Sequence, residues 1–150
     1  MNCTIDASVF VAAVRLQEQH YAVSREFLHQ VQAQAVNVFC PTLALPECAA
    51  AIARPTGDSA LAEELVALVE GFSRLHLIAL EPLLARRAAQ IAIAHRLRGA
   101  DATYVAVAET LEATLITWDT ETLERGSAAV ATITPAAWLE DQRQVEAQER

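Results

Sequence analysis

Near its start the chain reads Cys3-Thr4-Ile5-Asp6-Ala7-Ser8-Val9-Phe10. The short apolar run predicts a first β-strand that ends at a carboxylate, and the Ala/Val-rich segment after it has helical spacing. An Asp at such a junction lies where open α/β sheets place their ligands, just beyond the carboxyl end of a strand. Asp is also a favoured helix N-cap, so the alternative is that Asp6 only caps the first helix. The choice depends on whether other carboxylates reach the same edge.

Apolar runs alternate with helical patterns along the rest of the chain. Further strands are expected at 36–40, 75–80, 113–118 and 130–133. Helices are expected at 9–16, 20–34, 42–54, 61–72, 82–98, 102–112, 121–125 and from 135 onward. Parallel strands need long crossovers, so this order predicts an α/β sandwich: a mostly parallel five-stranded sheet between two layers of helices.

Pro, Gly and charged residues indicate where helices end, where a loop lies and where the domain ends. The segment Pro55–Ser59 is the clearest loop, and the helix before it is expected to close ahead of Pro55. Gly99 is expected to follow the C-terminus of the helix that ends near Arg98. We expect a single domain over residues 1–139, followed by a polar, frayed or disordered tail over 140–150.

The composition limits the function classes. The 150 residues suit one domain, and no apolar run reaches the roughly 20 residues that a membrane helix needs. No basic segment followed by a long apolar one marks a secretory signal, so we expect a cytoplasmic protein without a membrane partner. Cys3, Cys40 and Cys48 lack metal-type pair spacing and are expected to be buried thiols.

Charge excludes several chemistries. A net charge of −8 argues against a basic coat for general nucleic-acid binding, but not against an enzyme that binds phosphates through metal ions and a few arginines. All 11 basic residues are Arg, and the absence of Lys removes Schiff-base chemistry and Walker-type phosphate loops. The four His residues show no ligand spacing and are interpreted as structural or surface residues.

Four carboxylates are predicted to meet at one edge of the sheet. Asp6 and Asp119 each follow an apolar strand, and Asp101 begins a strongly apolar helix. Glu47 follows Pro46, which is tolerated only near a helix start, so Glu47 belongs to the first turns of its helix. Strand carboxyl ends and the following helix N-termini share one edge of a parallel sheet. Carboxylates gathered there repel one another, and Mg²⁺ or Mn²⁺ would relieve that repulsion.

Each of these acids also has a simpler explanation. Asp101 is a possible helix cap, and Glu47 a first-turn acid stabilised by the helix dipole. Asp119, within Trp-Asp-Thr-Glu, is a possible turn residue. The joint pattern is stronger than any single member, because unrelated caps need not share one edge.

Three polar residues are weaker candidates for a supporting role. The hydroxyls of Ser8 and Thr117 lie two residues from Asp6 and Asp119, where they can bind a metal water or a phosphate. Helix capping by Ser8 and the strand preference of Thr117 are equally good explanations. Glu121 is either a further acid of the site or an exposed residue at a helix start. Arg96 and Arg98 precede Asp101 and could reach substrate phosphates, but a solvated face and a dipole-compensating role at a helix C-terminus is the favoured interpretation.

The ordered set of acids resembles the PIN-domain nucleases, and among them the VapC-type toxins of bacterial toxin–antitoxin pairs. The matching segments span nearly the whole chain, from residue 3 to about 139: Ile5-Asp6-Ala7-Ser8, Pro46-Glu47, Leu97-Arg98-Gly99-Ala100-Asp101-Ala102 and Leu115-Ile116-Thr117-Trp118-Asp119. Each motif is short, so the specificity lies in their order and number.

The resemblance implies a fold, a site and partners. It implies strand order 3-2-1-4-5, and an acidic metal site made by Asp6, Glu47, Asp101 and Asp119, with Ser8 and Thr117 as polar partners. It further implies Mg²⁺- or Mn²⁺-dependent cleavage of RNA, a homodimer and an antitoxin that blocks the site. At the position where many members have a further Asp, this chain has Glu121.

The hypothesis is metal-assisted hydrolysis by an endoribonuclease, in which bound cations activate a water and offset the charge on the phosphate. Two alternatives compete with it. One is a non-catalytic PIN-like interaction module with a vestigial metal site. The other is a phosphatase with Asp6 as its nucleophile, which expects a second Asp where the chain has Ser8, and a Lys, which the chain lacks.

Overall fold

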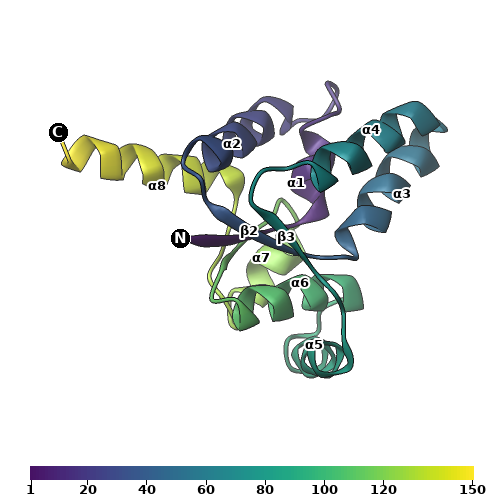
Figure 1. The fold of residues 1–150 in the computed structure, drawn as a ribbon. Coiled ribbons are helices and arrows are strands. Elements are labelled where there is room, and N and C mark those ends of the chain that lie inside the picture. Colours follow the sequence, from purple (N-terminus) through teal and green to yellow (C-terminus); the bar gives the residue numbers. More distant parts are fainter.

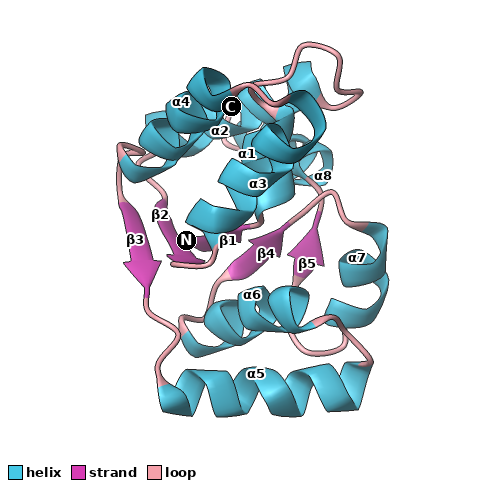
Figure 2. Cartoon of the chain, turned by 90° about the vertical axis from the view of Figure 1, so that its right-hand side faces the viewer, coloured by secondary structure: helices cyan, strands magenta, loops and turns pink.

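The first strand lies at the centre of a five-stranded sheet. In the computed structural model, which describes residues 1–150, the strands are β1 (Asn2–Ile5), β2 (Asn37–Pro41), β3 (Leu75–Ile78), β4 (Thr114–Ile116) and β5 (Thr132–Ile133). Every neighbouring pair is parallel, in the order β3-β2-β1-β4-β5 (Figure 2). Cys3 of β1 lies opposite Val38 on one side and Thr114 on the other. The predicted strand order is therefore confirmed.

Helices cover both faces of this sheet (Figure 1). One layer contains α1 (Ala7–Ala12), α2 (Tyr21–Ala33), α3 (Ala44–Thr56), α4 (Ser59–Glu70) and α8 (Pro135–Gln148). The other contains α5 (Pro82–His95), α6 (Gly99–Thr110) and α7 (Thr120–Gly126). In this second layer α5 packs on the outer side of α6 (Figure 2). The predicted three-layer sandwich is confirmed, and none of its helices is long and apolar enough to cross a lipid bilayer.

The apolar core lies mainly on the face covered by α1 to α4. Phe10 of α1 is fully buried there and meets Phe72 edge-on, with ring centroids 5.8 Å apart. On the opposite face α6 is enclosed between the sheet and α5, so every residue from 102 to 108 is buried. A helix that is covered on all sides is apolar all round, in contrast to the one-sided pattern of a surface helix.

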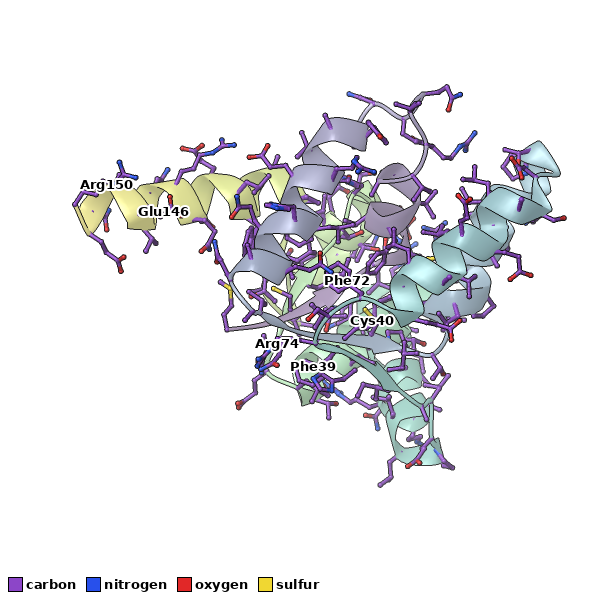
Figure 3. The ribbon with its side chains drawn as sticks, turned by 45° about the horizontal axis from the view of Figure 1, so that its top comes forward. Phe39, Cys40, Phe72, Arg74, Glu146 and Arg150 are labelled. Carbon is purple, nitrogen blue, oxygen red and sulfur yellow. The ribbon has the colours of Figure 1, made fainter.

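The three cysteines are free and buried, as predicted. Burial raises the pKa of Cys3 to about 11 and those of Cys40 and Cys48 to about 12, which keeps the thiols protonated. Figure 3 shows Cys40 and its neighbour Phe39 on opposite sides of β2, as the alternation of a strand requires. The Phe39 ring stacks on His76 of the edge strand, with centroids 5.0 Å apart.

The junction between α5 and α6 differs from the prediction. The first of these helices ends at His95, not near Arg98, and Arg96 closes it in the left-handed region with φ 55°. Gly99 is the first residue of α6 and not the residue that ends α5. The three-residue turn between the helices places the Leu97 side chain in the core, where it is 7% exposed. Burial of this leucine explains why the turn lies earlier in the chain.

Other element ends were also predicted wrongly. The first helix stops at Ala12, which leaves Leu16 75% exposed. Helix α3 continues through Pro55 to Thr56, because a proline in a last turn gives up only one hydrogen bond. Gly57, with φ 67°, then ends this helix in the left-handed conformation. Strands β3, β4 and β5 are each shorter than expected.

The polar C-terminal segment is helical where a frayed tail was predicted. Helix α8 runs to Gln148 and projects away from the domain, with Glu146 and Arg150 at its far end (Figure 3). Arg143 pairs with Glu26 of α2 at 3.0 Å, and Trp138 is buried against Phe27 of the same helix. A buried anchor at the start of the helix and an ion pair along it stabilise the polar segment.

Candidate acidic site at the carboxyl edge of the sheet

The predicted carboxylates line one cavity at the carboxyl edge of the sheet. The cavity has a volume of about 350 Å³ and is lined by Asp6, Ala7, Ser8, Val11, Glu47, Ala51, Arg98, Ala100, Asp101 and Asp119. The four acids come from four different elements: the starts of α1, α3, α6 and α7. Each of these helices begins shortly after a strand or a turn at the same edge, and this common origin brings their carboxylates together.

Asp6 is both a helix cap and a wall of the cavity. Its Oδ2 accepts hydrogen bonds from the Ser8 amide at 3.3 Å and from the Thr117 hydroxyl at 3.0 Å. Burial raises the pKa of Asp6, and the nearby Asp101 carboxylate adds to the rise, while the bonds from Ser8 and Thr117 oppose it. The capping and site interpretations of Asp6 are therefore compatible.

Thr117 connects two of the acids. Its hydroxyl donates to Asp6 and accepts from the Asp119 amide, also at 3.0 Å. Asp119 in turn caps α7, because its Oδ2 accepts from the Thr122 amide at 2.8 Å and from the Thr122 hydroxyl at 2.7 Å. Burial alone would raise the pKa of Asp119, but the bonds from Thr122 and the charge of Arg98 outweigh it and lower that pKa. This corner of the cavity is rigid and negatively charged.

Glu47 has the least compensated carboxylate of the four. It lies in the first turn of α3, and its Oε1 is buried without a hydrogen-bond partner. Burial raises its pKa, with added repulsion from Asp6 and Asp101, and the nearby Tyr104 hydroxyl offsets only part of this rise. An acid with a raised pKa and a free oxygen, next to other acids, is typical of a functional site.

The pairing of Arg98 with two of the acids was not predicted from the sequence. Its Nε donates to Asp101 Oδ2 at 2.8 Å, and its Nη2 donates to Asp119 Oδ1 at 3.2 Å. Burial and the Asp119 charge raise the pKa of Asp101, and Arg98 partly offsets that rise. Arg98 is 65% exposed, as predicted, but it is the N-cap of α6 and does not lie at the C-terminus of the preceding helix. Its spacing of three residues from Asp101 at a helix start is a signal for such an ion pair.

The supporting candidates divide into two groups. Ser8 lines the cavity, and its Oγ accepts from the Trp118 amide at 3.2 Å. Glu121 does not line the cavity; it pairs with Arg125 of its own helix at 2.8 Å. The Trp118 indole is held outside the cavity by a hydrogen bond to Ser24 at 2.8 Å, and it stacks on His20 with centroids 3.7 Å apart.

A second cavity adjoins the first along α3. It has a volume of about 610 Å³ and is lined by Glu47, Ala50, Ala51, Arg54 and Pro55. The two cavities share Glu47 and Ala51, so together they form a path from the acids to the exposed Arg54. The small alanine side chains leave room along this helix face.

The donor chemistry of the cavity suits a hard divalent cation. Four carboxylates supply only oxygen ligands, and the free Oε1 of Glu47 is an available donor. As the side chains lie, no three Asp, Glu, His or Cys groups are arranged to hold a metal ion, and Arg98 offsets part of the carboxylate charge. A cation bound by three of these acids would therefore need side-chain movements.

The chain belongs to the PIN domain family, whose sequence pattern it matches over residues 3–127. This range contains all four acids of the cavity. A comparison with curated proteins finds no sequence match.

Solved structures share the fold at low sequence identity. VapBC2 from Rickettsia felis, bound to a DNA fragment from its promoter, is 12% identical with a TM-score of 0.69 over 89% of this chain and 98% of that one. VapC20 from Mycobacterium tuberculosis, described as a sarcin–ricin loop cleaving toxin, is 17% identical with a TM-score of 0.68 over 85% and 94%. FitAcB from Neisseria gonorrhoeae is 20% identical with a TM-score of 0.65 over 90% and 98%. At these identities the likeness shows the PIN fold.

Proposed function

We propose that this chain is a metal-dependent endoribonuclease that hydrolyses RNA phosphodiester bonds and acts as the toxin of a toxin–antitoxin pair. The observation that carries this proposal is the convergence of four carboxylates, from four separate elements, on one cavity. Three of them have pKa values raised chiefly by burial, an arrangement that costs stability and is typical of a working site. Membership of the PIN domain family supports the same function.

Asp6, Glu47, Asp101 and Asp119 would hold Mg²⁺ or Mn²⁺. Such an ion, when bound, supplies a water of lowered pKa and offsets the charge that develops on the phosphate. Asp6 and Asp119 are held in place by Thr117, which fixes their spacing before any ligand arrives. Glu47 has a raised pKa and a free oxygen, and both suit a group that orients the attacking water and accepts its proton.

The second cavity supports a position for the RNA. Arg54 lies at the far end of the path that begins at Glu47, and its guanidinium is exposed. An arginine binds phosphate with two parallel hydrogen bonds, so Arg54 would hold a phosphate away from the scissile one. The backbone of a single strand would then run along α3.

The partners follow from the structural neighbours. The neighbour from Rickettsia felis is VapBC2, and the neighbour from Klebsiella pneumoniae is a toxin–antitoxin complex. We infer that this chain, too, has a cognate antitoxin that covers the acidic cavity, and that it forms a homodimer in the cytoplasm. Size-exclusion chromatography with light scattering tests the homodimer directly.

Cleavage of RNA with and without Mg²⁺ or Mn²⁺ tests the activity. Wild type should cleave only with the metal, and Asp101→Asn should lower the rate about 100-fold or more, the scale of losing one electrostatic stabiliser. Asp141→Asn is the matched control, because Asp141 is exposed on α8 and outside the cavity. Equal cleavage by wild type and Asp101→Asn would contradict the site assignment.

The second candidate is a non-catalytic PIN-like interaction module. The observation in its favour is that Arg98 already pairs with both Asp101 and Asp119 and offsets part of their charge without a metal. Titration with Mn²⁺ separates the two candidates. An active site should bind Mn²⁺ and lose that binding in Asp6→Asn, whereas a vestigial site should show no binding in either protein.

A further inference from the structure

Arg98 is held between two acids that come from different helices. Its guanidinium bonds to Asp101 at the start of α6 and to Asp119 at the start of α7, at 2.8 and 3.2 Å. No other arginine of the chain pairs with a carboxylate of this cavity. One cationic side chain thus spans two of the four acids that would ligate a metal ion.

The two acids are much less exposed than the arginine that joins them. The side chains of Asp101 and Asp119 are 12% and 28% exposed, whereas that of Arg98 is 65% exposed. Asp119 is also held by two hydrogen bonds from Thr122. The Arg98 side chain has no hydrogen bonds except those to these acids, and its backbone forms the N-cap of α6 without a side-chain capping bond. The guanidinium is therefore the more mobile partner, while Thr122 holds Asp119 and burial confines Asp101.

We propose that Arg98 competes with the divalent cation for Asp101 and Asp119, and thereby sets the metal affinity of the cavity. This inference rests on the proposed function, because it takes these carboxylates to be metal ligands. A guanidinium and a divalent cation repel each other, and both are attracted to the carboxylates of Asp101 and Asp119. Metal binding at these two acids should therefore weaken or break the ion pair with Arg98.

The size of the effect follows from the exposure of the pair. An ion pair with a largely exposed arginine is weak, so two such contacts together should change the Mn²⁺ binding constant by only a modest factor. Removal of the guanidinium should tighten Mn²⁺ binding about 3- to 10-fold. A purely structural role would have the opposite effect, because loss of Arg98 would then loosen the acids and weaken the binding.

Isothermal titration with MnCl₂ on the full chain tests this inference, with the electron paramagnetic resonance signal of free Mn²⁺ as a second measure. The variants are Arg98→Gln and its matched control Arg96→Gln. Arg96 is exposed, lies two residues away in the same turn, and has no ion pair, so the two variants change the net charge equally. Circular dichroism of each variant checks that it folds.

Tighter binding in Arg98→Gln, with a change below about twofold in Arg96→Gln, is the expected result. If wild type binds Mn²⁺ and Arg98→Gln binds it equally or more weakly, or if both variants gain equally, the inference is overturned while the proposed function stands. If no variant binds Mn²⁺, the metal-dependent function fails and the inference with it.

Discussion

Glu47 shows how single charges in the cavity affect stability. Burial raises its pKa, and its Oε1 has no hydrogen-bond partner. A carboxyl with a higher pKa in the folded than in the unfolded chain makes the native state bind protons more tightly. Its contribution to stability is therefore present at low pH and is lost as the pH rises from about 4, the usual value for Glu, through the raised value. At neutral pH Glu47 destabilises the fold.

Glu47→Gln should therefore stabilise the protein at pH 7. We expect a gain of about 1 kcal/mol in the free energy of unfolding, the size common when one strained active-site group is relieved. The gain should shrink toward pH 4, where the wild-type carboxyl is protonated as well. Urea denaturation of both proteins at the two pH values measures the difference. The same variant should lose RNA cleavage, because the amide accepts no proton from water.

Glu64→Gln is the control for this comparison. Glu64 is exposed on α4 and forms no ion pair, so its substitution should change stability by less than about 0.5 kcal/mol at either pH. A destabilised Glu47→Gln at pH 7, or a gain that is equal at both pH values, would show that the buried charge is not the cause.

At the scale of elements, the positions of the acids follow from a few local rules. Asp6 and Asp119 each follow a strand, and Pro46 confines Glu47 to a helix start. These rules place the three acids at one edge, since all strands of a parallel sheet point the same way. Helix capping did not compete with this placement, because Asp6 and Asp119 cap their helices and face the cavity at once.

Features that depend on tertiary contacts were not predictable in the same way. The turn at Arg96 depends on the burial of Leu97 in the core, which a single helical pattern does not reveal. The bridge from Arg98 to Asp119 joins residues 21 positions apart. The polar part of α8 has no apolar stripe of its own, and it packs on α2 through Trp138 and Arg143. Long-range packing decided each of these.

Helix α8 supports a prediction about where the stable domain ends. A chain that stops after Leu139 keeps the buried Trp138 and loses the exposed pair of Arg143 with Glu26. Such pairs contribute about 0.2–1 kcal/mol, so the free energy of unfolding of the truncated chain should lie within about 1 kcal/mol of that of the full chain.

Trp138→Ala should lower the free energy of unfolding by about 3–5 kcal/mol, because it leaves a large cavity against Phe27. Thermal and urea unfolding compare the three proteins. A larger loss from the truncation would extend the domain past residue 139.

For the molecule as a whole, a net charge of −8 has to be reconciled with the proposed binding of RNA. Two arginines lie along the proposed RNA path, Arg54 at one end and Arg98 at the other. Each phosphate that a protein neutralises on a single strand contributes a slope of about −0.7 to the logarithmic dependence of affinity on salt. Two contacts therefore predict a shallow total slope of about −1.4, far below that of a protein with a basic surface.

Arg54→Gln should make this slope shallower still. The variant should bind an uncleavable 2′-O-methyl RNA more weakly, with a slope reduced by about 0.7, because one phosphate contact is gone. Fluorescence anisotropy across a series of KCl concentrations, at fixed Mg²⁺, measures affinity and slope together. Arg86→Gln is the matched control: Arg86 is exposed on α5, in the helix layer on the opposite face of the sheet from α3, and forms no ion pair. Equal slopes for the two variants would exclude α3 as the RNA path. A wild-type slope near −5 would show that the RNA contacts many more positively charged side chains than these two arginines. A shallow slope that changes only with Arg54 requires the remaining affinity to come from the acidic cavity and its cation, which would explain how so acidic a protein binds a polyanion.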